Sequence, residues 1–213
     1  TEKGGSILRI DIKTGKKMPI EHNLDFYYYG QGGLLDILYK GGYVYVSYSE
    51  DRGEGSTSTS IARGLYDEKE IIFKNIFRAE PPISSGYHFG SRIVIKDDYL
   101  FASVGERGQG SVAQDLKSHA GSIIRINLDG SVPQNPYGEG VNSLSEIFQI
   151  GVRNPQGMAI SSNGDIYISN HGAKGGDFIG LIRPGGNYGW DEIGWGGKHY
   201  IGFKIGKRRV WLA

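Results

Sequence analysis

The chain has 213 residues, of which 35 are glycine and none is cysteine, and its formal net charge is +1 at pH 7. This length accommodates one or two domains with a sizeable core. The near-neutral charge excludes the basic surface that nucleic-acid binding requires, and no apolar run approaches the ~20 residues of a membrane-spanning helix. The lack of cysteine excludes disulfides, thiolate nucleophiles and zinc–thiolate sites.

Glycine is interspersed with tyrosine, isoleucine and valine along the chain. Valine, isoleucine and tyrosine favour strands, and glycine favours the tight turns between them. The composition therefore predicts an all-β protein with many short strands.

The N-terminal part of the chain shows strand-forming segments separated by turn residues. Gly5–Ile12 alternates apolar and polar residues, which predicts a half-buried strand. Tyr29–Asp36 and Tyr43–Tyr48 are predicted strands, and Lys40-Gly41-Gly42 between them predicts a hairpin turn.

A further connection and two more strands follow this hairpin. The acidic, serine-rich segment Ser49–Ser60 is predicted to be a loop. Ile61–Tyr66 and Glu70–Phe77 are predicted strands, so this part of the chain contains a meander of about four strands.

The strand–turn–strand pattern then recurs. Phe89–Glu106 repeats the layout of Leu34–Glu50, and Met158–His171 repeats it again. Gly121–Gly130 nearly copies Gly5–Asp11. The repeat has a period of about 60 residues. Because a single repeat cannot bury both faces of its sheet, this period indicates a stacked or circular array of repeats. Four strands per unit favour a β-propeller.

Three partial blades and pieces of a fourth are visible, whereas a closed propeller needs at least four. Residues 1–203 are therefore predicted to form part of a larger propeller. Residues 204–213 lack a blade-like pattern and contain a basic run, so they are predicted to be a divergent tail at a truncation of the sequence.

Polar residues of an unusual combination flank the last predicted hairpin. Arg153 and Asn154 precede it, and His171 follows it, at one end of the β-unit. Pro155 disfavours the α region for Asn154, so the Arg–Asn pair is expected to be extended. An arginine, an amide and a histidine together suit an anionic or polyoxygenated ligand.

His88 lies in a glycine-containing loop just before a predicted strand. Because histidine titrates near neutral pH, His88 is a candidate general base; a loop histidine that bonds a carbonyl group is the alternative. Arg153 could hold a carboxylate or quinone oxygen, or it could pair with a carboxylate of the chain. Gln31 could contact the same ligand or serve as a turn residue.

The loop from His171 to Asp177 is rich in turn residues. Its backbone carbonyls and Asp177 could bind a hard cation such as Ca²⁺, or Asp177 could cap a turn in a glycine-rich connection. Trp190 is expected to pack between blades. Four tyrosines could line a sugar-stacking surface or pack between blades: Tyr27, Tyr28, Tyr29 and Tyr87.

Six motifs occur in the order found in the soluble quinoprotein sugar dehydrogenases, the glucose/sorbosone dehydrogenase family, which the chain resembles up to about His199. They are Gly30–Asp36, His88–Arg92, Gly105–Gly108, Ala113–Leu116, Arg153–Gly157 and Asn187–Trp190. Each motif is short, and the specificity of the resemblance comes from their shared order.

The resemblance implies a six-bladed β-propeller that binds pyrroloquinoline quinone (PQQ) and Ca²⁺ at one end of the ring. It implies oxidation of an aldose at C1 to the lactone, with hydride transfer to PQQ and an electron acceptor as the further partner. A periplasmic or secreted location is also implied.

Individual residues acquire expected roles from the resemblance. His88 matches the general base that takes the anomeric hydroxyl proton, and Arg153 matches the residue that stabilises charge on the quinone oxygen. Gln31, Asn154 and Lys174 match positions that, with Arg153, bind the cofactor.

The metal site is expected in the His171–Asp177 loop. The carbonyls of Gly172 and Ala173, with Asp177, match the loop that binds the active-site Ca²⁺. The resemblance also implies further blades after Ala213, with basic residues that pair with the carboxylates of PQQ.

Two other functions stay open. A Ca²⁺-dependent sugar-lactone hydrolase would need several carboxylate or amide side chains around one ion. A propeller that only binds ligands would use the same histidine and arginine in turns.

Overall fold

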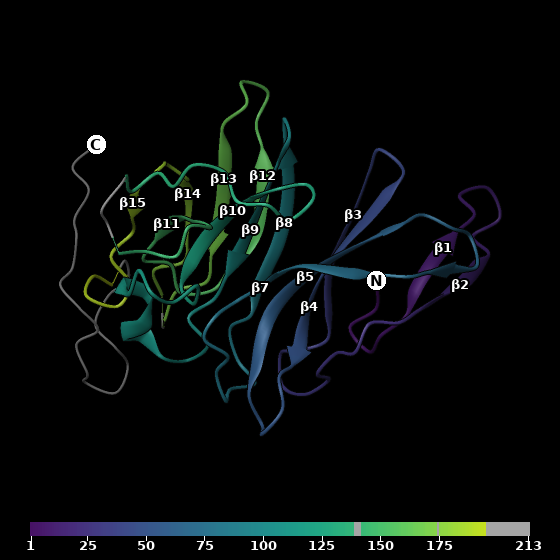
Figure 1. Ribbon diagram of the computed structural model, residues 1–213, viewed down its shortest axis with the longest axis horizontal. Coiled ribbons are helices and arrows are strands. Elements are labelled where there is room, and N and C mark those ends of the chain that lie inside the picture. The colour runs from purple at the N-terminus through teal and green to yellow at the C-terminus, as the bar shows by residue number, and fades with distance from the viewer. Residues whose placement is uncertain (139–141, 174, 195–213) are drawn as a thin grey trace.

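The computed structural model describes residues 1–138, 142–173 and 175–194, which form short strands and one 3₁₀ helix (Figure 1). The predicted all-β fold is confirmed. The predicted tail at 204–213 lies outside the described residues. In the described part of the chain, no helix has the length and apolar character needed to cross a membrane.

The elements are β1 (Ile7–Ile10), β2 (Lys17–His22), β3 (Leu34–Lys40), β4 (Tyr43–Asp51), β5 (Thr57–Leu65), β6 (Glu70–Ile71), β7 (Lys74–Arg78), β8 (Gly90–Lys96), β9 (Tyr99–Val104), the 3₁₀ helix Gly110–Gln114, β10 (Ser122–Asn127), β11 (Ile147–Ile150), β12 (Pro155–Ile160), β13 (Ile166–Asn170), β14 (Phe178–Leu181) and β15 (Gly186–Asn187). They form four sheets, which we call blades I to IV: β1-β2-β6, β3-β4-β5-β7, β8-β9-β10-β11 with β15 beyond β11, and β12-β13-β14.

Antiparallel hairpins begin blades II, III and IV, as the repeat predicts. In the first of them, Gly41 (φ 59°) and Gly42 (φ 83°) both adopt the left-handed conformation that a two-residue turn requires. A β-bulge follows the opening residue pair of each hairpin. The three opening pairs are Leu34–Tyr48, Gly90–Val104 and Pro155–Asn170.

Apolar cores lie between consecutive blades. Side chains alternate along β4, so Val44 and Val46 pack toward blade I whereas Tyr45 packs toward blade III. A third core joins blades III and IV. Each inner blade therefore buries both faces against its neighbours, and β8 contacts both β3 and β12. The inner strands β3, β8 and β12 of blades II, III and IV consequently lie side by side, with β8 between the other two.

The prediction that Ser49–Ser60 forms a loop is wrong. β4 extends to Asp51 and β5 begins at Thr57, so only 52–56 connect the two strands. The hydroxyl residues Ser49 and Thr57–Ser60 are buried, and their hydroxyl groups are hydrogen-bonded within the protein; Thr59 Oγ1, for example, donates to the Phe89 carbonyl of the next blade over 2.7 Å.

The prediction of a single strand over Glu70–Phe77 is also wrong. β6 pairs in parallel with β2 of blade I, whereas β7 pairs with β5 of blade II. The break between them lets Phe73 enter the core between blades I and II while Phe77 enters the next core. β15 joins β11 of the preceding blade in the same parallel manner.

Candidate active site

Three of the residues singled out from the sequence precede inner strands at equivalent ends. Gln31 lies before β3, His88 before β8 and Asn154 before β12. These strand starts lie at one rim of the blades, because the His88 N–H bonds Gln31 Oε1 and the Gly90 N–H bonds Asn154 Oδ1. The second strand of each hairpin is antiparallel and ends at the same rim, which adds the residues after β9 and β13 to the site.

His88 is held from two sides. Its backbone N–H donates to Gln31 Oε1 over 2.8 Å, and its Nδ1 lies 2.8 Å from Glu106 Oε1. The residue has a positive φ of 50°, and a Cβ on Gly105 would collide with the His88 carbonyl oxygen. The sequence left open that His88 is a loop histidine bonded to a carbonyl group. In the structure its ring contacts the carboxylate of Glu106.

Glu106 is a residue of this rim to which sequence reasoning assigned no role; it contacts both His88 and Arg153. Its side chain is only 3% exposed, and Oε2 has no hydrogen-bond partner within the described residues. Arg153 Nε lies 3.8 Å from Oε1, the oxygen that also faces His88. The repeat holds the signal that could have found it, because Glu106 and Glu50 occupy the same place, two residues after the opening pairs of their hairpins.

Arg153 points its guanidinium into the same rim. Nη1 donates to the carbonyl oxygens of His171 (3.2 Å) and Gly172 (3.1 Å), and Cζ lies 5.7 Å from the centre of the Trp190 ring. Burial lowers the pKa of Arg153, although the group stays a cation at neutral pH. Trp190, expected only to pack between blades, therefore also faces this arginine.

Asn154 is 1% exposed and is fixed through its oxygen, which accepts the N–H of Gly90 over 3.1 Å. Its Nδ2 is buried without a partner in the described part of the chain. The backbone N–H groups of Arg153 and Asn154 both donate to Asn170 Oδ1, at 3.0 and 3.1 Å. An orphaned buried donor in the residue that follows an arginine of this rim is suited to an oxygen-rich ligand.

In the loop predicted to bind Ca²⁺, the Gly172 carbonyl and one oxygen of Asp177 are already hydrogen-bonded within the chain. Asp177 Oδ1 accepts the N–H of Gly172 over 2.6 Å and faces His171 Nδ1 at 3.0 Å, and the ring contact, followed by this N–H, lowers the pKa of Asp177. The described residues contain no group of three or more histidine, cysteine or acidic side chains that could hold a metal. Ala173 lies in this loop, whereas Lys174 is outside the described residues.

Three of the four tyrosines singled out from the sequence are exposed, and one of them, Tyr87, lies against the His88 ring. Tyr29 is 71% exposed and Tyr87 61%, and the Tyr87 ring meets the His88 ring edge-on with centroids 6.3 Å apart. Tyr28 is also exposed, at 64%, whereas Tyr27 is half-buried against Tyr29.

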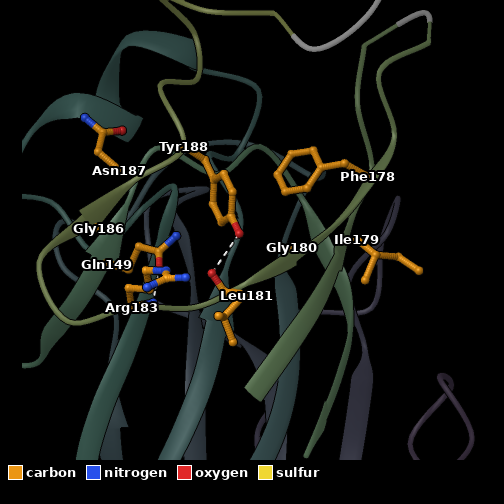
Figure 2. Close-up of a pocket in the computed structure, with 9 residues that line it drawn as sticks. All are labelled: Gln149, Phe178, Ile179, Gly180, Leu181, Arg183, Gly186, Asn187 and Tyr188. Atoms are coloured by element: carbon orange, nitrogen blue, oxygen red, sulfur yellow. Dashed lines mark hydrogen bonds between the residues drawn. The ribbon is translucent and has the colours of Figure 1, made fainter. Parts of the chain in front are cut away.

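A cavity of about 350 Å³ at the edge of blade IV is a separate feature (Figure 2). Its lining comes from β11, β14, β15 and the turn between the last two, and the Tyr188 hydroxyl donates to the Leu181 carbonyl across 2.8 Å. None of the predicted site residues that the structure describes lines it. The candidate active site is therefore the rim around His88 and not this cavity.

Comparison with known proteins agrees with this geometry. The family model described as "Glucose / Sorbosone dehydrogenase" matches residues 1–210. The aldose sugar dehydrogenase YliI of Escherichia coli K12 is 36% identical over 216 residues, which cover 96% of this chain and 58% of the relative. Quinoprotein glucose dehydrogenase B of Acinetobacter calcoaceticus is 30% identical and is covered over 46% of its length.

Solved structures show the same fold. The apo form of the soluble aldose sugar dehydrogenase from Escherichia coli has a TM-score of 0.93 at 34% identity, covering 99% of this chain and 64% of that one. The PQQ-bound aldose sugar dehydrogenase from Streptomyces coelicolor has a TM-score of 0.77 at 30% identity, covering 95% and 60%. The β-propeller prediction is confirmed, and the chain, which spans about three fifths of these structures, belongs to the glucose/sorbosone dehydrogenase family.

Proposed function

We propose that this chain carries the catalytic rim of an aldose dehydrogenase that oxidises the sugar at C1 to the lactone and passes hydride to PQQ. The His88–Glu106 pair carries the proposal, because a buried carboxylate 2.8 Å from Nδ1 prepares an imidazole for proton transfer. The proposal concerns the whole protein, since the chain covers 58% of its Escherichia coli relative.

His88 acts as the general base. An ionised Glu106 only accepts hydrogen bonds, so it keeps the proton of a neutral His88 ring on Nδ1 and leaves the lone pair on Nε2. Nε2 takes the proton of the anomeric hydroxyl, the C1–H bond breaks with its electron pair leaving as hydride, and the C1=O bond of the lactone forms.

Bound PQQ supplies the acceptor for this hydride. Asn154, Arg153 and Gln31 are the described residues that would hold it, with Lys174 as a further expected ligand. Asn154 fits because a ligand oxygen would satisfy its buried Nδ2, and Arg153 fits because its cationic fork binds planar oxygen groups. Arg153 would also stabilise negative charge that develops at this rim.

The residues of the predicted Ca²⁺ loop support a bound ion less strongly than Asn154 and Arg153 support PQQ. The Gly172 carbonyl already accepts Arg153 Nη1, so a cation bound there would lie beside a positive charge. Binding through Gly172, Ala173 and Asp177 therefore requires Arg153 to turn toward the cofactor. No step of the reaction is assigned to the ion.

The hydrolase alternative is weaker on the chemistry of the side chains. Its metal would need several converging acidic or amide groups, and the described residues contain no such cluster of acidic and histidine side chains. A purely binding propeller would not need the buried, half-unpaired carboxylate of Glu106 behind the histidine.

Reconstitution of the natural-length protein with PQQ and Ca²⁺ tests the proposal. With glucose and an artificial electron acceptor, we expect dye reduction and formation of the lactone. Consumption of added lactone without dye reduction would establish the hydrolase. If neither reaction occurs, the protein is a propeller that only binds ligands. An aldose and an electron acceptor are thus the proposed partners, in the periplasm or outside the cell.

A further inference from the structure

Arg107, the residue after Glu106, is an arginine with 3% exposure whose charge the proposed reaction does not use. Burial lowers its pKa to about 10, so it remains protonated at neutral pH. A buried cation is stable only if its donors are satisfied, and its surroundings therefore show what it holds in place.

The guanidinium of Arg107 binds the segment that leads into His88. Nε donates to the Tyr87 carbonyl over 2.8 Å, and Nη2 donates to the Ser85 carbonyl. On the opposite side, Nη1 reaches the Thr57 carbonyl at 3.0 Å and Nη2 reaches the Thr57 hydroxyl at 2.6 Å. One fork thus ties the 85–87 backbone to the start of β5.

The planar face of the same guanidinium stacks on Phe89, with Cζ 3.7 Å from the ring centre. The residues before and after His88 are therefore both held by Arg107, while Glu106 holds the His88 ring. His88 and Arg107 have positive φ values of 50° and 60°. This backbone conformation is uncommon outside glycine, so surrounding contacts must maintain it.

We propose that Arg107 is a positioning residue for His88. Arg107 holds the Ser85 and Tyr87 carbonyls before the histidine and the Phe89 ring after it, so that Nδ1 stays on Glu106 and Nε2 faces the sugar. The inference rests on the proposed function for its catalytic consequence, but its structural consequence is independent of any activity. Lysine cannot replace the arginine, because one ammonium group offers neither the planar fork nor the stacking face.

Arg107→Lys in the natural-length protein tests the clamp. Hydrogen exchange, measured without cofactor, should accelerate at least about tenfold at the His88 amide, which is bonded to Gln31, and not in β9. In the reconstituted enzyme, kcat should fall about 10- to 100-fold while the KM for the sugar changes less than about threefold.

Arg63→Lys is the matched control. Arg63 also bonds a carbonyl, that of Leu128, over 2.7 Å and lies 4.8 Å over the Tyr43 ring, but at the other end of β5 from Thr57. The Arg63→Lys variant should leave the hydrogen-exchange rate of the His88 amide and kcat unchanged. Thr57→Val removes one partner of Arg107 and should give an intermediate effect, which keeps the test valid if Arg107→Lys does not fold.

Unchanged exchange at His88 together with unchanged kcat in a folded variant would overturn the proposal, as would faster exchange spread evenly over all blades. If the wild-type protein shows no dehydrogenase activity, the proposed function fails. The exchange measurement at His88 then still decides whether Arg107 holds this residue.

Discussion

Glu50 of blade II and Glu106 of blade III occupy the same repeat position but differ in how far their oxygens are satisfied. Glu50 accepts Arg78 Nε on both oxygens at 2.9 Å, Asn75 Nδ2 at 2.9 Å and the Ser60 hydroxyl at 2.6 Å. Glu106 has an imidazole on one oxygen and no partner on the other within the described residues.

Under the proposed function, the same repeat position has a structural role in blade II and a role in the reaction in blade III. A carboxylate saturated by donors is stabilised as a fixed anion and cannot respond to a ligand. Glu106 contacts the His88 ring through one oxygen, and within the described residues its other oxygen accepts no hydrogen bond. In blade IV the same position is Gly172, which has no side chain; its carbonyl accepts Arg153 Nη1 and its N–H donates to Asp177 Oδ1.

His88→Gln should have the largest effect. The reconstituted enzyme should lose about 10²- to 10⁴-fold in kcat, because glutamine cannot take the hydroxyl proton, while thermal stability changes little. Steady-state kinetics and a melting curve check this. Full activity of the variant would remove His88 from the reaction and reduce Glu106 to a second structural carboxylate.

Glu106→Gln and Glu50→Gln form the direct test of the comparison. Glu106→Gln should lower kcat about 100-fold, because an amide N–H can turn toward Nδ1 and change the tautomer of His88. Glu50→Gln should leave kcat unchanged and lower the free energy of unfolding by about 1–3 kcal/mol, through lost charged hydrogen bonds. Kinetics and urea denaturation of both variants measure this, and equal effects would contradict the division of roles.

Arg153→Ala should weaken PQQ binding about 10-fold or more, the value of a charged hydrogen bond. Fluorescence titration of the apo protein with PQQ measures the Kd without turnover. An unchanged Kd would show that Arg153 serves only to hold the carbonyls of His171 and Gly172. Repeating the titration with Ca²⁺ shows whether the ion and the arginine compete for the Gly172 carbonyl.

The smallest effect concerns a second His–Glu pair, which sharpens the contrast with His88. His119 accepts the Glu80 N–H on Nδ1 at 2.9 Å, so its Nε2 carries the proton that faces Glu146 at 3.4 Å. Both ring nitrogens of the buried His119 therefore have partners within the protein. We expect the His119–Glu146 pair to have no part in turnover.

The bond from His119 lowers the pKa of Glu146 below its ordinary 4.5. A carboxyl group whose pKa is lowered in the folded state stabilises the fold above its unfolded pKa, and this stabilisation is lost as pH falls through the folded value. Glu146→Gln should therefore cost about 1 kcal/mol at pH 7 and progressively less below about pH 4.5. Urea denaturation at both ends of this range measures it, with kcat expected to stay unchanged.

Local pattern was sufficient for much of the fold. Alternating residues, paired glycines at 41–42 and the near-copy of Gly5–Asp11 in blade III depend on neighbours in the chain, and they correctly predicted the hairpins and the propeller. The same reasoning failed at Ser49–Ser60, because a buried hydroxyl looks like a loop residue until the next blade supplies its carbonyl partner.

The sequence by itself determined the repeat, the family resemblance and the residues placed at strand starts, because these are written in local order and spacing. Only the tertiary structure decided which groups meet there. That Arg153 faces the Glu106 oxygen beside His88, and that Arg107 reaches Thr57, depends on how separate blades pack. Contacts between segments about 50 residues apart carry no local signature, since each residue alone is equally compatible with a solvated turn.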